Sequence, residues 1–306
     1  MKIGRAESVE RRNFLVIVKL LGGLGNQMFQ YATGRAVAHR LGVDLLVDVS
    51  SFAHYDLRRY ELGDWSIPAR VANADELNRA GVTLAPPTFL RRVGRALGIG
   101  QPLNTFKETS FAYDPSILNV TAPLYLDGYW QSERYFSDIA GLLRQDFVLS
   151  EQADAKNKAM ASMIDSAGSH AVSLHIRRGD YVSNQQTAQY HGVCSLDYYR
   201  AAVDHVAQHV FDPHFFVFSD DLAWVSENLK LDHPMTLVDV NNADKGAWDM
   251  ALMMACRHHV IANSSFSWWG AWLNPHEEKI VVAPRHWFSG ATHDTSHLVP
   301  SSWVRL

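Results

Sequence analysis

Short apolar runs alternate with amphipathic stretches through the second half of the chain. The apolar runs predict buried strands, at residues 170–176, 214–218, 235–239, 259–262 and 279–283. The stretches between them predict helices, at residues 195–209, 221–229, 246–257 and 266–273. Strands that alternate with helices of this length are typical of a parallel, doubly wound α/β sheet.

The first half begins with the same pattern. Residues 14–19 predict a buried strand, a glycine-rich loop follows, and a helix is expected to run to Leu41 before a strand at 43–48. Residues 52–123 show no clear period, and two further helices are expected at 133–145 and 151–165. A chain of 306 residues is long for one core and sufficient for two. We therefore expect three parts: a tail at 1–13, an N-terminal lobe at 14–167 and a C-terminal lobe at 168–306.

Charge and composition exclude several classes of partner. The net charge is −4, which gives no general attraction for nucleic acid or anionic lipid, so an anionic ligand must be captured locally. Only two cysteines are present, which argues against a disulfide framework. The apolar run at 14–18 is too short for a signal peptide or a membrane span. We expect a cytoplasmic protein with at most peripheral membrane association.

The predicted strand at 170–176 ends in charged residues, in the stretch Val172-Ser-Leu-His-Ile-Arg-Arg-Gly-Asp180. Open α/β sheets place their ligands at the carboxyl ends of their strands. Arg177 and Arg178 point in opposite directions if the strand persists, so one can face a ligand while the other braces the loop. A guanidinium suits a phosphate because it donates two parallel hydrogen bonds. The structural alternative is an ion pair between Arg178 and Asp180.

The glycine-rich loop, Leu21-Gly-Gly-Leu-Gly-Asn-Gln27, joins a strand to a helix start, where backbone N–H groups favour an anion. The dinucleotide-binding fingerprint would need a third glycine at Met28. An acidic residue, Asp48, does close the next strand, so a nicotinamide cofactor remains an alternative. Asn26 and Gln27 suit sugar hydroxyls or a simple helix cap.

Several other strands end in candidate ligand groups that should meet at one sheet edge. Ser219-Asp220-Asp221 follows one strand, and Asn263-Ser264-Ser265 follows another and starts a helix. Helix capping alone is the plainer explanation for the two serines. The stretch Tyr125–Phe136 is dense in aromatic residues, which serve core packing or a sugar platform equally well.

Metal chemistry has little support in the sequence. The 15 histidines are scattered and no His-Glu-x-x-His motif occurs. No Asp-x-Asp occurs either, which argues against a sugar transferase that holds Mg²⁺ or Mn²⁺ between carboxylates and a donor diphosphate. We expect no metal and no cofactor.

Five ordered motifs together resemble those of the bacterial and animal α-1,2-fucosyltransferases. They are Gly22-Gly-Leu-Gly-Asn-Gln-Met-Phe-Gln-Tyr-Ala32, Gly128-Tyr-Trp-Gln-Ser-Glu-Arg-Tyr-Phe136, His175-Ile-Arg-Arg-Gly-Asp180, Phe218-Ser-Asp-Asp221 and Asn263-Ser-Ser-Phe-Ser-Trp-Trp-Gly-Ala-Trp272. The resemblance implies a GT-B-like glycosyltransferase, with two Rossmann-like lobes facing across a cleft, that uses GDP-fucose without a metal. The N-terminal lobe would take the acceptor and the C-terminal lobe the GDP-fucose.

The resemblance also implies roles for individual residues. Arg177 would hold the donor β-phosphate, and Asn26 would lie beside the transferred sugar. In α-1,6 relatives, an aspartate that stands sixteen positions before a serine at a helix start contacts guanosine and phosphate. Asp249 and Ser265 match that spacing here. Some relatives keep a glutamate in the glycine-rich loop as catalytic base, but this loop has no acid, so Asp180 is our candidate. The catalytic set is then Arg177, Asp180 and Asn26. The expected substrate-binding set is Gly23, Gly25, Gln27, His175, Arg178, Asp220, Asp249, Asn263, Ser264 and Ser265.

The sequence therefore predicts an inverting enzyme that moves L-fucose from GDP-β-L-fucose to the 2-hydroxyl of a terminal galactoside. A bacterial enzyme of this kind would build a surface glycan such as O-antigen, with GDP-fucose and a galactose-terminated oligosaccharide as its partners and no nucleic acid. Three alternatives remain: an α-1,6-type or other GDP-fucose-dependent fucosyltransferase, a nucleotide-sugar-binding protein without turnover, and a nicotinamide-dependent oxidoreductase.

Overall fold

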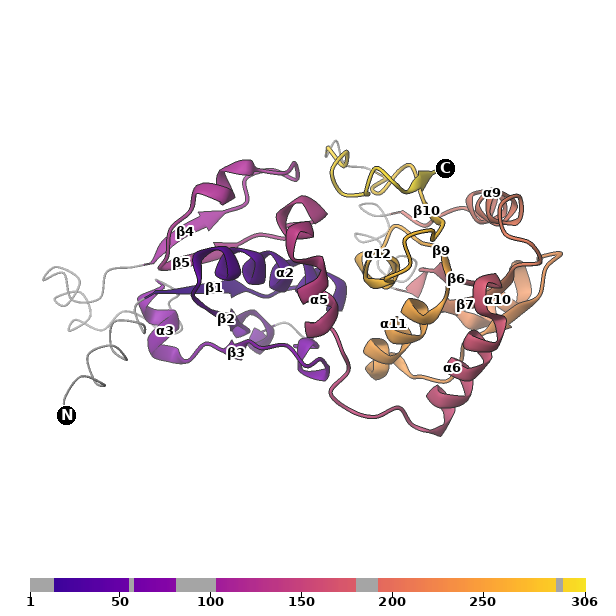
Figure 1. The fold of residues 1–306 in the computed structure, drawn as a ribbon, viewed down its shortest axis with the longest axis horizontal. Coiled ribbons are helices and arrows are strands. Elements are labelled where there is room, and N and C mark those ends of the chain that lie inside the picture. Colours follow the sequence, from indigo (N-terminus) through magenta and orange to yellow (C-terminus); the bar gives the residue numbers. More distant parts are fainter. Residues whose placement is uncertain (1–13, 55–57, 81–102, 180–191, 290–293) are drawn as a thin grey trace, which may run out of the picture. The chain divides into compact units, whose positions relative to one another are not determined.

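The structure is a computed structural model that describes residues 14–54, 58–80, 103–179, 192–289 and 294–306 (Figure 1). The chain divides into two compact units, Met1–Asp146 and Phe147–Leu306. Each unit contains one parallel β-sheet with helices, so the α/β class expected from the sequence is confirmed. Among the described residues, no helix is both long and apolar enough to cross a membrane.

The first unit is built on a five-stranded sheet in the order β3-β2-β1-β5-β4, with every pair of neighbours parallel. Its strands are β1 (Leu15–Lys19), β2 (Asp44–Asp48), β3 (Arg70–Val71), β4 (Asn104–Lys107) and β5 (Leu124–Asp127). Its helices are α2 (Leu24–Leu41), α3 (Ala74–Arg79) and α5 (Ala140–Asp146). β1 is the central strand. Its neighbour on one side, β2, is the next strand along the chain, whereas its neighbour on the other side, β5, comes from much later in the chain.

Helix α2 lies directly on β1 and β2. A Cβ atom at Gly34 would come within 2.9 Å of side-chain atoms of Val18 and Leu45, so only glycine permits this approach. The helix ends at Gly42, whose φ of 67° is left-handed and whose N–H bonds back to the carbonyls of Ala38 and His39. The expected strand, glycine-rich loop and helix are therefore all present.

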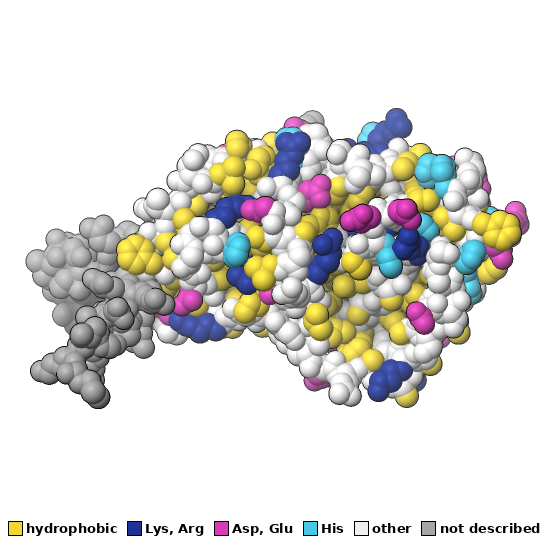
Figure 2. Space-filling model, viewed as in Figure 1, with side chains coloured by type: hydrophobic (Ala, Val, Ile, Leu, Met, Phe, Trp, Pro, Cys, Tyr) yellow, Lys and Arg dark blue, Asp and Glu magenta, His cyan; other side chains and the backbone are white. Residues whose placement is uncertain are grey.

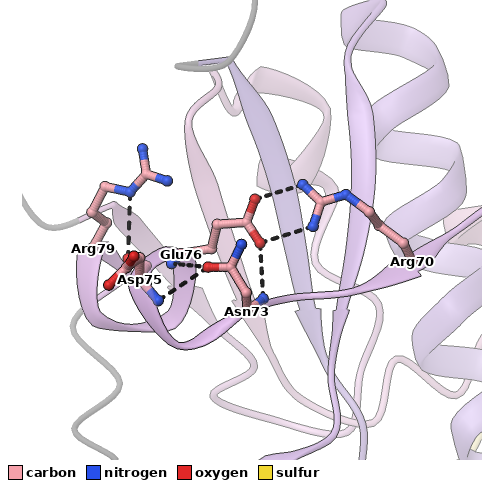
Figure 3. A network of polar contacts seen from close by, with 5 residues as sticks. All are labelled: Arg70, Asn73, Asp75, Glu76 and Arg79. Atoms are coloured by element: carbon pink, nitrogen blue, oxygen red, sulfur yellow. Dashed lines mark hydrogen bonds and ion pairs between the residues drawn. The ribbon is translucent and has the colours of Figure 1, made fainter.

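Helix α3 lies in the stretch where the sequence shows no clear period, and polar contacts define it (Figure 3). Asn73 and Glu76 form a capping box, in which each side chain bonds the other residue's backbone N–H. Arg70 adds two bonds to the Glu76 carboxylate, of 2.9 and 2.5 Å. These bonds lower the pKa of Glu76. A six-residue helix is thus fixed by local hydrogen bonds more than by apolar periodicity.

The second unit has a six-stranded parallel sheet in the order β11-β10-β9-β6-β7-β8. Its strands are β6 (Ala171–Ile176), β7 (His214–Ser219), β8 (Met235–Leu237), β9 (His258–Val260), β10 (Val281–Ala283) and β11 (Val304–Arg305). Its helices are α6 (Ala155–Ala167), α9 (Leu196–Ala207), α10 (Leu222–Asn228), α11 (Gly246–Ala255) and α12 (Ser265–Leu273). Counted along the chain, the strand order is 3-2-1-4-5-6, the order of the Rossmann fold.

Two apolar clusters cover the two faces of this sheet. On one face, Val172 and Leu174 of β6 belong to a cluster with Tyr199 and Val203 of α9. On the other face, Phe216 and Phe218 of β7 belong to a cluster with residues of α6 and α11, namely Met160, Ile164, Leu252 and Met253. Burial on both faces explains why all six residues of β6 are buried, including the polar Ser173 and His175.

The division between the units lies earlier than the 167/168 boundary expected from the sequence. Helix α6 was expected to close the N-terminal lobe, but Met160 and Ile164 pack into the core of the second unit. Asp146, the last residue of the first unit, bonds the Tyr31 hydroxyl and the Arg35 guanidinium of α2. The turn at Ala167-Gly-Ser169 therefore joins α6 to β6 inside the second unit.

Positive and negative side chains are mixed on the face of the molecule drawn in Figure 2. On the face drawn in Figure 2, Lys and Arg side chains lie among Asp and Glu side chains and form no extended field of one sign. This mixture agrees with the small net charge of −4. An anionic ligand would therefore depend on a few placed groups rather than on long-range attraction.

Candidate functional site

The second unit has its topological switch point between β6 and β9, where the strand order reverses. Ligands of open α/β sheets bind outside the carboxyl ends of the strands at such a point. The chain after β6 carries Arg177 and Arg178, and the chain after β9 carries Asn263 and Ser264. The motifs that the sequence predicts at strand ends therefore follow two adjacent central strands and lie at the same edge of the sheet.

Asp220, after β7, organises the end of β6. Its carboxylate accepts one bond from Nη1 of Arg177, at 2.9 Å, and one from the backbone N–H of Arg178, at 2.8 Å. A Cβ atom at Gly179 would lie 2.6 Å from Oδ2 of Asp220, so the strand end passes this carboxylate too closely for any side chain. Arg177 remains about one-quarter exposed at the sheet edge. Asp220 thus orients Arg177.

Arg178 has different surroundings, as strand alternation predicts. Its guanidinium carbon lies 3.7 Å from the centre of the Trp224 ring, and its Nε donates to Asp221 at 3.3 Å. Asp221 also caps α10 by accepting from the backbone N–H of Trp224. These contacts tie Arg178 to α10 and give it a bracing role, and its expected role in substrate binding stays a prediction. Asp180, its other expected partner and our candidate base, lies outside the described residues.

His175 is the next-to-last residue of β6, two positions before Arg177, and it is buried. Burial lowers its pKa to about 3, the Arg177 charge adds to that effect, and Asp220 opposes it. The imidazole is therefore neutral near pH 7. Its ring packs on Phe266 at 5.6 Å, and its Nδ1 has no hydrogen-bond partner within the described part of the chain. A buried ring nitrogen without a partner is uncommon, because buried polar atoms are nearly always hydrogen-bonded.

Asn263 proves to be a structural brace. It is 3% exposed, and its amide nitrogen donates to the carbonyls of Gly192 and Trp287 while its oxygen accepts from Cys194. These bonds hold two loops against the end of β9, so the substrate-binding role expected for Asn263 is not supported. An asparagine side chain can fill either role, and the sequence motif does not distinguish them.

Ser264 and Ser265 start helix α12. Ser264 is the N-cap, and its hydroxyl accepts from the backbone N–H of Phe266 at 3.3 Å. This geometry matches the plainer capping explanation. Ser265 is the first helical residue and is half-buried. The start of α12 lies close to the start of α11, because a Cβ atom at Gly246 would meet the Phe266 ring at 3.5 Å.

Asp249 lies in the first turn of α11. Its carboxylate accepts from the Asn241 side chain at 2.8 Å, and Asn241 in turn exchanges two bonds of 2.9 Å with Asn157. Burial raises the pKa of Asp249 to about 6, although the Asn241 bond opposes the shift. This half-buried carboxylate is thus held in place while its charge is poorly solvated, and a ligand that donates hydrogen bonds would stabilise it.

The first unit has its own switch point, between β1 and β5. The glycine-rich loop follows β1, and the loop Gly128–Gln131 follows β5. Gln131 Nε2 donates to Asn26 Oδ1 at 2.7 Å and so links the two loops. Gly22 has a φ of 80°, and a Cβ atom there would come within 2.7 Å of the Asn26 amide nitrogen. Asn26 is therefore held in a defined orientation at this edge by Gln131 and by its close approach to Gly22.

Gln27 does not face a ligand. It is fully buried, its amide nitrogen donates to the carbonyls of Gly22 and Arg59, and its oxygen accepts from the N–H of Glu61. The sugar-binding role expected for Gln27 is therefore replaced by a structural one, which fastens residues 59–61 to the glycine-rich loop. Gly23 is the N-cap of α2, and Gly25 lies buried in its first turn.

Two charged residues in or next to the segment that Gln27 binds lie at the glycine-rich loop, and the sequence did not predict either contact. The Glu61 carboxylate accepts from the backbone N–H of Leu24, at the start of α2, and burial raises its pKa. The Arg58 Nε would lie 3.7 Å from a Cβ atom on Gly23. The loop itself has no acid, as expected, but the fold supplies one from 34 residues away. The segment that carries Glu61 has no period, so nothing in the sequence pointed to this contact.

In the parts of the chain that the structure describes, no group of three or more His, Cys, Asp or Glu side chains is placed to hold a metal ion.

Comparison with known proteins gives a consistent set of relatives. A sequence model of the family described as "Glycosyl transferase family 11" matches residues 110–305. An α-1,2-colitosyltransferase of Escherichia coli is 31% identical over 95% of this chain and 99% of its own length. The O-antigen biosynthesis glycosyltransferase WbnK of Escherichia coli is 34% identical over 94% and 99%. A galactoside 2-α-L-fucosyltransferase of Mus musculus is 26% identical over 86% of this chain and 65% of its own length.

Solved structures are more distant. The α-1,6-fucosyltransferase NodZ, co-crystallised with GDP, aligns at 13% identity with a TM-score of 0.46 over 84% of this chain and 91% of its own. Arabidopsis thaliana FUT1 in complex with GDP aligns at 11% identity with a TM-score of 0.46, over 90% of this chain and 74% of its own.

Proposed function

The chain belongs to glycosyl transferase family 11, and from that premise we propose that it transfers L-fucose from GDP-β-L-fucose to the 2-hydroxyl of a terminal galactoside, with inversion. The observation that carries the proposal is the end of β6. There Asp220 orients Arg177 at the switch point of a Rossmann-ordered sheet, beside the buried nitrogen of His175. An arginine so placed is suited to a diphosphate.

The names of the relatives bear most directly on which sugar the donor carries. The mammalian relatives are named for L-fucose and for a galactoside acceptor, whereas one bacterial relative is named for colitose, which is L-fucose without its 3-hydroxyl. The linkage in both names is α-1,2. We therefore keep L-fucose as the donor sugar and treat colitose transfer as the alternative that the donor assay must separate.

The chemistry follows from the change of configuration. A β-linked donor gives an α-linked product when the acceptor hydroxyl attacks the face opposite the departing diphosphate. Negative charge then grows on the β-phosphate oxygen as the glycosidic bond breaks. Preorganised donors aimed at such a charge are commonly the largest catalytic term. Arg177 supplies them, because a guanidinium has five N–H donors in a fixed plane and Asp220 holds that plane at the sheet edge.

The acceptor hydroxyl must lose a proton during this attack. A positioned base contributes roughly 10²–10⁴-fold in typical enzymes. Asp180, two residues after Arg178, is our candidate. Glu61 is the rival that the fold provides, since its partly buried carboxylate lies at the glycine-rich loop and has a raised pKa. Their substitutions give different pH profiles, as described below.

We propose a metal-independent reaction in the bacterial cytoplasm that serves synthesis of a surface glycan. The sequence has no Asp-x-Asp, so Arg177 and backbone N–H groups at helix starts would balance the diphosphate charge in place of a divalent cation. The relation to an O-antigen glycosyltransferase supports the pathway class. We also propose that the first unit takes the acceptor and the second takes GDP-fucose.

A nucleotide comparison tests the donor class. GDP should raise the Tm and UDP and NADP should not, because a ligand at a hundred times its Kd stabilises the fold by about 2.7 kcal/mol. Stabilisation by NADP alone would favour the oxidoreductase alternative.

An activity assay then tests the reaction. Purified enzyme with GDP-fucose and lactose should release GDP, and the product should carry fucose on the galactose 2-hydroxyl by NMR. GDP-colitose in place of GDP-fucose separates the two sugars. GDP binding without any release would mark a binding protein, and a 6-linked product would mark the α-1,6 alternative.

A further inference from the structure

The aromatic stretch after β5 divides into a buried part and an exposed residue. Trp130, Tyr135 and Phe136 are at most 1% exposed and belong to the core of the first unit. Tyr129, between Gly128 and Trp130, is 41% exposed. The sequence could not decide between core packing and a sugar platform for this stretch. The structure assigns three of the residues to the core and leaves Tyr129 at the surface.

The turn that carries Tyr129 is anchored by Glu108, the residue after β4. The Glu108 carboxylate accepts from the backbone N–H groups of both Tyr129 and Trp130, at 2.7 and 3.0 Å. Trp130 has a φ of 58°, which is rare for a large side chain, and its ring stacks on Phe106 and meets Tyr135 edge-on. The backbone of this turn is thus fixed by the Glu108 carboxylate and by the buried Trp130 ring, and Tyr129 is exposed on it.

Polar groups flank the same turn at the carboxyl end of the sheet. β5 pairs with β1 at the switch point, and directly after the paired residues Lys19 forms an ion pair with Asp127 at 3.2 Å. On the other side of the turn, Gln131 bonds Asn26 of the glycine-rich loop. All four of these side chains are partly exposed. An exposed aromatic residue therefore stands in the chain between two pairs of hydrogen-bonding side chains.

We propose that this turn is the acceptor subsite, with the Tyr129 ring lying against the apolar face of the terminal galactose. One face of galactose is a continuous C–H surface, because its 4-hydroxyl is axial and projects from the other face. A fixed aromatic ring matches such a face, while the amides of Asn26 and Gln131 match the hydroxyls around it. The inference rests on the proposed function, since it gives the first unit's role as acceptor side a specific residue.

The matching experiment is a kinetic comparison of Tyr129→Ala with Tyr129→Phe. Loss of the ring should raise the KM for lactose about tenfold, on the scale of aromatic contacts. The KM for GDP-fucose and the slow release of GDP in water without acceptor should stay within about twofold of the wild type, because the donor contacts are in the second unit. Tyr129→Phe keeps the ring and should keep most of the acceptor affinity.

Phe14→Ala is the matched control. Phe14 is also an exposed aromatic residue of the first unit, at 54%, but it precedes β1 and so lies at the amino end of the same sheet. It should change neither KM. Tyr129→Ala should fold normally because an exposed ring adds little to the core, and an unchanged Tm would verify this.

Two results would overturn the inference. In the first, Tyr129→Ala keeps the wild-type KM for lactose. In the second, it raises the KM for GDP-fucose alone, which would make the ring a nucleotide platform. If the wild type released no GDP with any galactoside, the proposed function would fail separately. Saturation-transfer NMR with methyl β-D-galactoside would then still decide, since binding to the wild type and not to Tyr129→Ala supports the subsite and equal signals refute it.

Discussion

Arg177 should be needed in a way that lysine cannot replace. Lysine keeps the charge, but its ammonium cannot bridge two diphosphate oxygens in the plane that Asp220 fixes for the guanidinium. Arg177→Lys should lower kcat by roughly 10²-fold or more, as for other preorganised donors, while GDP affinity falls less. Steady-state kinetics and a GDP titration measure the two effects.

Arg178→Lys is the control for that experiment. Arg178 stacks on Trp224 and bonds Asp221, so its replacement should lower the Tm and leave appreciable activity. A fully active Arg177→Lys beside an inactive Arg178→Lys would mean that the two roles are reversed. Two active variants would refute the phosphate-clamp interpretation of this strand end.

Asp249 should make GDP binding depend on pH. Its pKa of about 6 in the unliganded protein lies above its ordinary value of 3.8, because burial disfavours the charge. If guanosine donates hydrogen bonds to the carboxylate, binding favours the ionised form, so GDP affinity should fall as the pH drops from 7.5 to 5. Calorimetric titrations at several pH values test this, and Asp249→Asn should flatten the dependence as well as weaken binding.

The same group has the opposite effect on the unliganded protein. A carboxyl whose pKa is raised by folding stabilises the fold while it is protonated, and that contribution is lost as the pH rises from about 4 to about 6. Without GDP, the Asp249→Asn protein should therefore lose less stability over this interval than the wild type. Denaturant melts at both ends of the interval give the difference.

Asp180→Asn should flatten the acidic limb of the pH–rate profile if Asp180 is the base. Glu61→Gln is the parallel variant, because glutamine can still accept from the Leu24 N–H and so preserves the helix start. A normal acidic limb in Asp180→Asn together with a flattened limb in Glu61→Gln would transfer the role to Glu61. If Glu61→Gln instead behaves as wild type, Glu61 serves only to cap α2.

For individual residues, the sequence predicted which side chains carry ligand chemistry better than it predicted what those side chains contact. The pair Arg177 and Arg178 could be assigned to opposite sides because alternation along a strand is fixed by the backbone. Gln27 and Asn263 were placed in the binding set, yet both are buried braces, because an amide satisfies a backbone group as readily as a sugar. Glu61 was missed, because its contact with the glycine-rich loop depends on the tertiary fold alone.

Among the elements, the glycine-rich loop gives the sharpest test. Gly22→Ala and Gly42→Ala both place a Cβ on a left-handed residue, which costs about 1–2 kcal/mol. At Gly42 nothing lies within 4 Å of that atom, whereas at Gly22 it would come within 2.7 Å of the Asn26 amide. Both variants should lose stability in denaturant melts, and only Gly22→Ala should also lose most of its activity.

Equal activity in the two variants would contradict this prediction. It would show that the Asn26 side chain can move without effect, and so that its orientation by Gln131 does not matter for turnover.

Elements with a clear apolar pattern were predictable, and elements without one were not. Helices α2, α9, α11 and α12 lie within a few residues of their expected ranges, because apolar spacing and caps such as Ser195 define them. The helix expected at 133–145 is instead two 3₁₀ turns, Glu133–Tyr135 and Ser137–Ile139, followed by α5. Phe136 interrupts it with a φ of −146°. Strands β3 and β11 have two residues each, too few to show alternation.

For the whole molecule, we predict activity without a divalent metal. Chelator added to the purified enzyme should leave most of the rate of GDP release, since Arg177 and helix starts are proposed to balance the diphosphate charge. Loss of activity with chelator and its recovery with Mn²⁺ would refute the prediction. Arg177→Lys assayed with and without Mn²⁺ is the control, because a metal that merely substitutes for the guanidinium would help only this variant.

The α/β class and the two units followed from the alternation of strands and helices, but the order of strands within each sheet did not. Sequence patterns identify strands one at a time, whereas their order depends on how each crossover packs. The division between the units was misplaced for a related reason. The apolar face of α6 could cover either sheet, and only packing of Met160 and Ile164 on the second core decides.

The two switch points also have a consequence for how the protein folds. Across them, β1 must join β5, pairing Val16 with Leu124, and β6 must join β9, pairing Val172 with His258. The partners on the other side of each central strand are nearer in sequence, at Leu15 with Asp44 and Ala171 with His214. Longer loops cost more entropy to close and slow folding, so each crossing should be a late event. The ability to bind GDP should therefore return only with the last phase of refolding, after most secondary structure has formed.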